Sequence, residues 1–308
     1  MRVVFFGTPD FAVPSLSALV DAGFDVPLAV TQPDRPVGRS DRPRPSPVAE
    51  AARERGIPTE TPERLRGNDA FFERLAAARP DAIAVVAYGR LLPEAVLQLP
   101  PLGCVNLHAS LLPKYRGASP ISAAILAGDR ETGVVTMKIV SELDAGPLYL
   151  ERRIGITDRE DAASLSERLA REGAELLVET LSALGAGTIS PCPQKGEPTF
   201  TRPLTRDHGR VDWGETASEI ERRLRAFSPW PGLHTFLDGE RIKLLDLDVA
   251  ADGDRAKGPG AIWSDGEGAK VAAGDGTAVR LLSVQRAGRR PVSGAELVRQ
   301  IPPNARFE

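Results

Sequence analysis

Two polar side chains, Asn106 and His108, stand two positions apart in an apolar segment of this 308-residue sequence. The apolar neighbours at residues 103–108 predict a buried strand. Because alternate residues of a strand project to the same face, the Asn106 amide and the His108 imidazole are expected side by side. A neutral amide donor beside a titratable donor suits the stabilisation of an oxyanion on a tetrahedral carbon. The alternative is that both groups only satisfy nearby backbone, since buried polar groups are normally hydrogen-bonded.

A third candidate is Asp144, in the turn-rich segment at residues 141–147 that directly follows a predicted strand. If its carboxylate reaches His108, its charge favours the imidazolium and raises a pKa that starts near 6.5. The carboxylate can also take a proton from an attacking amine, directly or through water. Sequence alone leaves open that Asp144 only caps a turn.

Other catalytic chemistries have weaker support. Ser110, His108 and Asp144 suggest a serine hydrolase, but Ser110 lacks the Gly-flanked elbow that exposes such a nucleophile. The chain contains no G-x-G-x-x-G after its first strand, no Walker loop and no H-E-x-x-H. Its three histidines, His108, His208 and His234, are too dispersed to predict a zinc site, so no metal is expected.

The composition is that of a globular protein without an overall basic character. There are 39 Lys+Arg against 42 Asp+Glu, for a formal net charge of -3, so any contact with nucleic acid must be a local basic patch. The two cysteines, Cys104 and Cys192, suggest reduced thiols. No span approaches ~18 apolar residues, so a cytoplasmic protein without a membrane partner is expected.

The elements that must position the polar residues follow from hydrophobic periodicity. Over the first 185 residues, apolar runs alternate with helical patterns, which indicates βαβ units around a parallel sheet. Strands are predicted at residues 2–6, 25–31, 81–87, 103–108, 132–140 and 148–154, and helices at 9–22, 48–55, 69–78 and 162–184. For the first helix, Thr8 is the expected N-cap and Gly23 the terminator. His108 then lies at the carboxyl end of a parallel strand, where open α/β sheets bind ligands.

The character of the sequence changes after Gly185. Residues 185–203 contain four prolines and are predicted to be a linker. A helix at 217–227 precedes short β-type runs at 234–237, 242–249, 261–263, 270–273 and 278–284, which suggest a small barrel. The predicted fold class is α/β, with an N-terminal Rossmann-like, mostly parallel sheet domain at 1–186. A linker at 187–205 leads to a smaller C-terminal OB-like β-barrel domain at 206–308.

Two basic stretches stand out from this acidic chain. Residues 32–47 hold five prolines and show no periodicity, which predicts an unusually long loop without regular structure. Four arginines in this loop (Arg35, Arg39, Arg42 and Arg44) oppose two aspartates, for a local charge of +2. A second stretch holds Arg280, Arg286, Arg289 and Arg290, with no acidic residue between 275 and 296. Either stretch can equally be a solvated surface.

Several of these motifs together resemble the folate-dependent formyltransferases. The shared core is Asn106–His108, the stretch SLLPKYRGASPI at 110–121, and Asp144-Ala145-Gly146. Further features are similar to the branch of the family that formylates methionyl initiator tRNA. They are GTPDF at 7–11, the loop 31–39 leading into 45–48, and VDW at 211–213 with FSPWPG at 227–232. The likeness covers nearly the whole chain.

This resemblance implies a reaction. The formyl donor would be the co-substrate 10-formyltetrahydrofolate, and the acceptor the α-amino group of methionine esterified to initiator tRNA. Asn106 and His108 would hold the oxyanion, while Asp144 would orient His108 and relay the proton as tetrahydrofolate leaves. Neither a metal nor a covalent intermediate would be needed, and a monomer is expected.

The resemblance also implies two binding sites. Ser110, Leu111, Leu112 and Pro113 would line the folate site. The long loop enters the tRNA acceptor stem in the family, so the implied tRNA contacts are Arg35, Arg39, Arg42 and Arg44, together with Arg286, Arg289 and Arg290 of the small domain.

Three alternatives stay open at this point. The acceptor can be a small amine such as an amino sugar nucleotide, although a small acceptor gives no reason for a long arginine-bearing loop. The enzyme can hydrolyse formyltetrahydrofolate, although the second domain would then be idle. A non-catalytic tRNA-binding module would leave Asn106, His108 and Asp144 without a reason to share one site.

Overall fold

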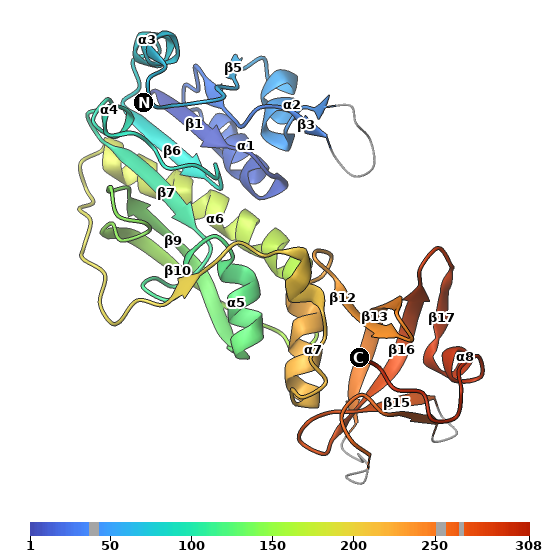
Figure 1. Cartoon of the computed structure of the whole chain (residues 1–308). Helices are drawn as coiled ribbons and strands as arrows, with labels where there is room; N and C mark the ends of the chain where they lie inside the picture. Colours follow the sequence, from blue (N-terminus) through green and yellow to red (C-terminus); the bar gives the residue numbers. More distant parts are fainter. Residues whose placement is uncertain (37–42, 251–256, 265–267) are drawn as a thin grey trace. The chain divides into compact units, whose positions relative to one another are not determined.

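The computed structural model describes residues 1–36, 43–250, 257–264 and 268–308 (Figure 1). Its contacts divide the chain into two compact units. Unit 1 comprises Met1–Pro120, Glu131–Gly155 and Ser166–Arg202, and unit 2 comprises Ile121–Arg130, Ile156–Leu165 and Pro203–Glu308. The domain boundaries at 186 and 206 stay a prediction, because this division interleaves short segments of the two units.

Unit 1 is built on a mostly parallel sheet of seven strands in the order β10-β9-β7-β6-β1-β2-β5. Only β9 breaks the parallel arrangement, since it runs antiparallel to both β7 and β10. The strands are β1 (Val3–Gly7), β2 (Ala29–Val30), β5 (Thr59–Glu60), β6 (Ala82–Val86), β7 (Cys104–His108), β9 (Glu131–Lys138) and β10 (Leu148–Gly155). The Rossmann-like part of the predicted fold class is confirmed.

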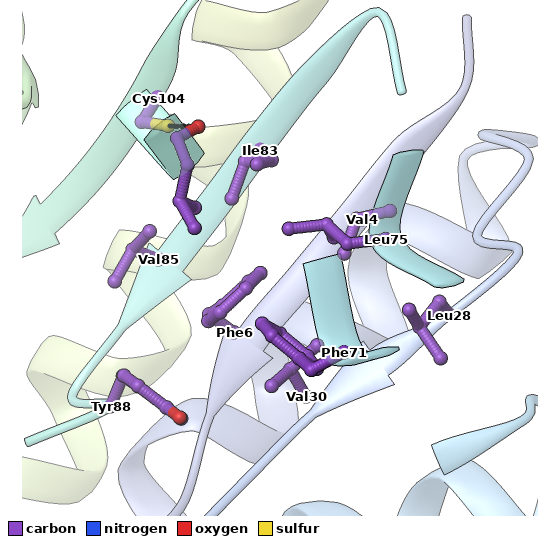
Figure 2. Close-up of a cluster of buried hydrophobic side chains, with 11 residues drawn as sticks. Val4, Phe6, Leu28, Val30, Phe71, Leu75, Ile83, Val85, Tyr88 and Cys104 are labelled. Carbon is purple, nitrogen blue, oxygen red and sulfur yellow. Dashed lines mark hydrogen bonds between the residues drawn. The ribbon is translucent and has the colours of Figure 1, made fainter. Parts of the chain in front are cut away.

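One face of this sheet is closed by an apolar cluster beneath α3 (Asp69–Ala77), shown in Figure 2. Phe71 and Leu75 of α3 pack there with residues of β1, β2 and β6. The Phe6 ring meets that of Tyr88 edge to face, with centroids 5.1 Å apart. At the β7 side of the cluster, the Cys104 thiol contacts the Val96 carbonyl of α4 (Glu94–Leu97) at 3.7 Å.

The alternation of β7 decides which way its polar residues face. Leu107 packs on α6 (Ala162–Gly185), so closely that a Cβ built on Gly173 would lie 2.7 Å from a Leu107 methyl group. Cys104 points to the opposite face, toward α4. Asn106 and His108 share the Cys104 face by the two-residue period of the strand, as the sequence predicts.

The start of the first helix differs from the prediction. A short 3-10 turn, η1 (Asp10–Ala12), precedes α1 (Val13–Asp21), and Thr8 is not an N-cap. Its hydroxyl instead donates to the Tyr88 carbonyl at 3.2 Å and accepts from the Gln32 backbone N–H at 3.4 Å. Thr8 therefore ties the ends of β1, β2 and β6 together. Gly23 ends this helical segment with a φ of 81°, as predicted.

The long loop is more regular at its ends than the sequence indicates. β3 (Arg35–Pro36) pairs antiparallel with β4 (Pro43–Arg44), so these two segments form a hairpin base. Ser46 then caps α2 (Pro47–Glu54) by accepting from the Ala49 N–H at 3.1 Å. The expectation of an entirely irregular loop is wrong for these residues.

The segment predicted to be a linker packs onto unit 1 up to Arg202. Cys192 exchanges two backbone hydrogen bonds with Leu148, at 2.8 and 2.7 Å. Farther on, β11 (Phe200–Thr201) pairs in parallel with β8 (Arg116–Gly117). We call residues 192–201 the strap, because both of its ends are bonded to the body of unit 1.

Unit 2 contains an antiparallel sheet in the order β12-β13-β16-β15-β14, with β17 on β16. Its strands are β12 (Leu233–Leu237), β13 (Glu240–Ala250), β14 (Ile262–Ser264), β15 (Ala269–Ala272), β16 (Ala278–Arg286) and β17 (Pro291–Ser293). Helices α7 (Ala217–Ala226) and α8 (Gly294–Val298) belong to the same unit, and α5 (Pro120–Ala127) lies, apart from its first residue, in the Ile121–Arg130 segment of unit 2. None of the helices in the described part of the chain is long and apolar enough to cross a membrane.

Candidate active site

His108 and Asp144 meet in unit 1, although they come from separate parts of the chain. His108 is the last residue of β7, and Asp144 lies in the connection between β9 and β10. The His108 Nδ1 atom is 3.8 Å from an Asp144 carboxylate oxygen, with side chains 8% and 14% exposed. The structure therefore brings the predicted imidazole and carboxylate together, at a distance slightly longer than a direct hydrogen bond.

The short segment from Tyr115 to Gly117 binds both of these side chains. The His108 Nε2 atom lies 3.0 Å from the Tyr115 carbonyl oxygen. A carbonyl only accepts hydrogen bonds, so Nε2 carries the proton and Nδ1 is the ring atom that faces Asp144. The same carboxylate oxygen of Asp144 accepts from the Gly117 N–H at 2.7 Å. The segment from Tyr115 to Gly117, which includes β8 (Arg116–Gly117), thus aligns the two groups.

Asn106 lies half-buried in the middle of β7, between Val85 of β6 and Met137 of β9. Among the residues that the structure describes, its side-chain amide has no hydrogen-bond partner. A polar group that is half removed from water and unpaired is available to a ligand. The Asn106 amide is therefore free to bind a ligand, and its role as the neutral donor stays a prediction.

Burial controls the protonation of His108. Removal of the ring from water lowers the pKa of the imidazole below its ordinary value of 6.5. The Asp144 charge and the Tyr115 hydrogen bond both raise this pKa, but burial outweighs them. The expectation of a raised pKa is therefore wrong in net direction, although the effect of Asp144 has the predicted sign.

Two glycines of the site have no room for a side chain. Gly146 follows Asp144 closely, and a Cβ at this position would overlap the Lys138 carbonyl oxygen. Gly117 has a φ of 113°, and a Cβ there would overlap the Thr201 carbonyl of the strap. Asp144 itself has a φ of 48°, in the left-handed region that aspartate tolerates better than most residues. These constraints explain why glycine stands at position 117, after Arg116, and at position 146 of the Asp144-Ala145-Gly146 motif.

The four residues expected to line the folate site are partly withdrawn from solvent. Ser110 is fully buried, and its hydroxyl donates to the Lys114 carbonyl at 2.6 Å. Leu111 and Leu112 pack on an apolar cluster with Val135 and Met137 of β9, and the Leu112–Pro113 peptide bond is cis. A buried, committed hydroxyl argues against Ser110 as a nucleophile. The contact of residues 110–113 with folate stays a prediction.

Two residues of the site were missed at the level of sequence. Gln194, in the strap, donates from its side-chain amide to the backbone carbonyls of Asp144 and Gly146, both at 2.8 Å. Arg116 is 9% exposed and donates to the Gln194 side-chain oxygen at 2.8 Å. Nothing in the spacing of the sequence connects position 194 with position 144, because a proline-rich stretch carries no periodicity.

The arginines predicted to contact tRNA fall into two groups. Arg35 and Arg44 are exposed and lie directly opposite each other in the β3–β4 hairpin, whereas Arg39 and Arg42 are outside the described residues. In unit 2, Arg286 is ion-paired with Glu240, and Arg290 lies 3.7 Å from Glu296. Arg289 is exposed between them. Glu240 and Glu296 therefore reduce the local charge of the second basic stretch.

Within the part of the chain that the structure describes, no three His, Cys, Asp or Glu side chains are grouped so that they could hold a metal ion.

The sequence matches known families over both of its parts. Residues 1–181 match the formyl transferase family, and residues 203–302 match the formyl transferase C-terminal domain. Solved structures agree in fold. An N-formyltransferase from Helicobacter canadensis, in complex with folinic acid and dTDP-3-aminofucose, is 17% identical, with 93% of this chain and 99% of that chain covered and a TM-score of 0.66. HypX from Aquifex aeolicus, in complex with tetrahydrofolic acid, is 19% identical, with coverages of 97% and 47% and a TM-score of 0.62. Fold, site and matches together define a formyl transferase.

Curated relatives narrow this class. The methionyl-tRNA formyltransferase of Thermus thermophilus is 47% identical over 301 residues, which are 97% of this chain and 96% of the relative. That of Pelotomaculum thermopropionicum is 42% identical over 302 residues, with coverages of 98% and 96%. The chain belongs to the methionyl-tRNA formyltransferase family.

Proposed function

We propose that this protein transfers the formyl group of 10-formyltetrahydrofolate to the α-amino group of methionyl initiator tRNA, as a monomer in the cytoplasm. The observation that carries the proposal is the approach of His108 to Asp144, at 3.8 Å, on the same face of β7 as the unpaired Asn106 amide. Near-full-length similarity to methionyl-tRNA formyltransferases supports the choice of donor and acceptor.

The chemistry follows from these groups. The amine nitrogen attacks the formyl carbon, the new C–N bond forms, and the formyl oxygen becomes an oxyanion. The Asn106 amide donates to this oxygen. Nε2 of His108 is committed to Tyr115, so His108 adds a second donor only when Nδ1 is also protonated. Oxyanion donors of this kind are each worth about 3–4 kcal/mol in the barrier.

Asp144 handles the proton. The nitrogen that has attacked carries an excess proton, which passes to the Asp144 carboxylate, directly or through water. The bond from the formyl carbon to N10 of the folate then breaks, the C=O bond reforms, and the leaving nitrogen takes a proton. Asp144 therefore acts as base and then as acid. Before it accepts the proton, its charge also favours a proton on His108 Nδ1.

The β3–β4 hairpin supports a polyanionic acceptor. Arg35 and Arg44 are cross-strand partners, and like charges that face each other destabilise a strand pair. A phosphate backbone that lies along the hairpin removes this repulsion, whereas a small amine does not. We therefore assign tRNA contact to the hairpin and, in residues 206–308, to Arg289 with smaller parts for Arg286 and Arg290. The catalytic domain in this proposal is residues 1–186, and Ser110–Pro113 line the folate site.

A transfer assay tests the function and its residues together. Wild-type protein with 10-formyltetrahydrofolate should formylate charged initiator tRNA and leave an amino sugar nucleotide unchanged. His108→Ala and Asp144→Ala should each lower kcat by about 10²–10⁴-fold with tRNA affinity nearly intact, because both remove groups that act on the reacting atoms.

The exposed Gln98→Ala serves as the control and should keep full activity. Preferential formylation of the sugar nucleotide, or release of formate without acceptor, would contradict the proposed acceptor. Near-normal turnover in either site variant would contradict the residue roles.

A further inference from the structure

The side chain of Gln194 uses its full hydrogen-bonding capacity inside unit 1. Its two amide hydrogens reach the backbone carbonyls of Asp144 and Gly146, both at 2.8 Å. Its oxygen accepts two hydrogen bonds from the Arg116 guanidinium, from Nε at 3.2 Å and from Nη2 at 2.8 Å. A primary amide offers two donors and two lone pairs, so none is left unused. Gln194 therefore clamps the backbone on both sides of Ala145.

Arg116 links this clamp to the other partners of the catalytic pair. Its neighbours Tyr115 and Gly117 bind His108 and Asp144 through backbone atoms. The guanidinium also lies 3.6 Å from Glu142, earlier in the Asp144 connection. Arg116 is 9% exposed, so its hydrogen bonds to Gln194 are shielded from water, whereas the Glu142 side chain is 74% exposed and its pairing with Arg116 is screened.

The strap that carries Gln194 is anchored on both sides of it. Cys192 is bonded to Leu148 at the start of β10, and the Arg116 N–H donates to the Thr199 carbonyl at 2.8 Å. The Thr199 hydroxyl accepts from the Tyr115 N–H, also at 2.8 Å. Because the backbone of the strap is anchored on both sides of Gln194, only the rotamers of this side chain remain to be ordered when it binds, which makes it an effective positioning group.

Asp144 needs such support. Its backbone has a φ of 48°, and its carboxylate stands 3.8 Å from His108, so small movements of the connection change the alignment. A displacement of about 1 Å in a catalytic group can reduce turnover by about 10²-fold. We propose that Gln194, held by Arg116, is a positioning residue that fixes the Asp144 connection for formyl transfer. This inference rests on the proposed function.

Substitutions at Gln194 separate the clamp from the rest of the strap. Gln194→Glu keeps oxygens for Arg116 but replaces the amide donors by a carboxylate that repels the carbonyls of Asp144 and Gly146. Gln194→Ala removes both interactions. Gln98→Ala is the matched control, because its exposed amide bonds only to Glu94, at 2.7 Å. We expect kcat to fall by about 10–100-fold in both Gln194 variants, with KM values for both substrates within threefold.

A double-mutant cycle with Asp144→Ala, measured as single-turnover formylation, identifies the route of the effect. If Gln194 acts through Asp144, adding Gln194→Ala to Asp144→Ala causes less than a twofold further loss. Thermal unfolding of every variant is measured in parallel, and rates are compared well below the lowest midpoint so that all variants are folded.

The outcomes separate the two proposals. Failure of the wild-type protein to formylate tRNA contradicts the proposed function itself. Active wild-type protein, together with Gln194→Glu within twofold of its kcat, overturns the positioning role. Multiplicative losses in the double variant also overturn it, because Gln194 would then act independently of Asp144.

Discussion

At His108, burial and a neighbouring charge have opposite effects on the pKa of the imidazole. Burial lowers the pKa of the ring, and the nearby Asp144 carboxylate recovers only part of this shift. The resting ring is therefore neutral at pH 7, with its proton on Nε2 toward Tyr115. A neutral ring leaves Nδ1 able to gain a proton as charge develops during transfer, which suits a group that must act at physiological pH.

The lowered pKa of His108 predicts a loss of stability on mild acidification. The unfolded chain binds a proton near pH 6.5, while the folded protein does so only at lower pH, so the contribution is complete above about 6.5 and is lost as the pH falls below it. The free energy of unfolding should drop by up to about 1.4 kcal/mol per pH unit for this group. Urea unfolding at pH 7.5 and 5.5 measures the drop, and His108→Gln should reduce it.

His234 in unit 2 provides the comparison, because burial lowers its pKa as well. His234→Gln should reduce the acid sensitivity further, and the double variant should show the smallest change between the two pH values. An equal drop in wild type and His108→Gln would mean that His108 does not titrate in this way.

At the scale of elements, β8 connects the catalytic side chains to the strap. Its two residues pair with β11, and its Gly117 N–H binds Asp144, while Tyr115, directly before it, binds His108. This pairing holds the strap, which follows α6 in the chain, against unit 1. The strap is therefore part of the site and not merely a linker to unit 2. Gly117 is the point at which these contacts are closest.

Replacement of Gly117 should therefore disturb the site more than the strain from its positive φ alone would. Gly117→Ala adds a Cβ that overlaps the Thr201 carbonyl, and the resulting shift moves the N–H that binds Asp144. We expect formylation to fall by more than 10-fold. Gly187→Ala is the control, since Gly187 also has a positive φ, of 69°, but open space around its Cβ position. Equal activities of the two variants would show that the contact with the strap is unimportant for transfer.

At the scale of the whole molecule, charge is distributed unevenly. The chain has a net charge of -3, yet the hairpin that begins at Arg35 and ends at Arg44 places exposed cations opposite each other. The basic stretch of unit 2 is weaker than its sequence suggests, because Arg286 and Arg290 have acidic neighbours. Electrostatic attraction of tRNA is therefore expected to depend most on the hairpin.

Simultaneous replacement of Arg39, Arg42 and Arg44 by alanine should weaken the use of tRNA and flatten its salt dependence. The slope of log affinity against log salt should fall by about one unit for each phosphate that the variant no longer binds. The measurement is kcat/KM for tRNA between low and physiological salt. Arg286→Ala should change the slope less, because Glu240 already neutralises that guanidinium. An unchanged slope in the triple variant would remove the hairpin from the tRNA interface.

The sequence by itself determined the local elements and the residue types of the site. Periodicity located β7, the β9–β10 pair, α6 and β12 to β16 of unit 2, because burial of an apolar face leaves a regular pattern in the chain, but it missed the short β17. Sequence motifs identified Asn106, His108 and Asp144 as candidate catalytic residues and indicated the formyltransferase family. Thr8 was misjudged because its hydroxyl bonds to distant backbone at Tyr88 instead of capping a helix, which no local pattern reveals.

Only the tertiary structure decided how these parts act together. It brought Asp144 to His108, showed that burial outweighs the carboxylate in setting the imidazole pKa, and paired Arg286 with Glu240. It also turned a proline-rich segment into the strap that presents Gln194 to the Asp144 backbone. Each of these depends on distances between groups far apart in the chain, and such distances are set by packing, which has no signature in residue spacing.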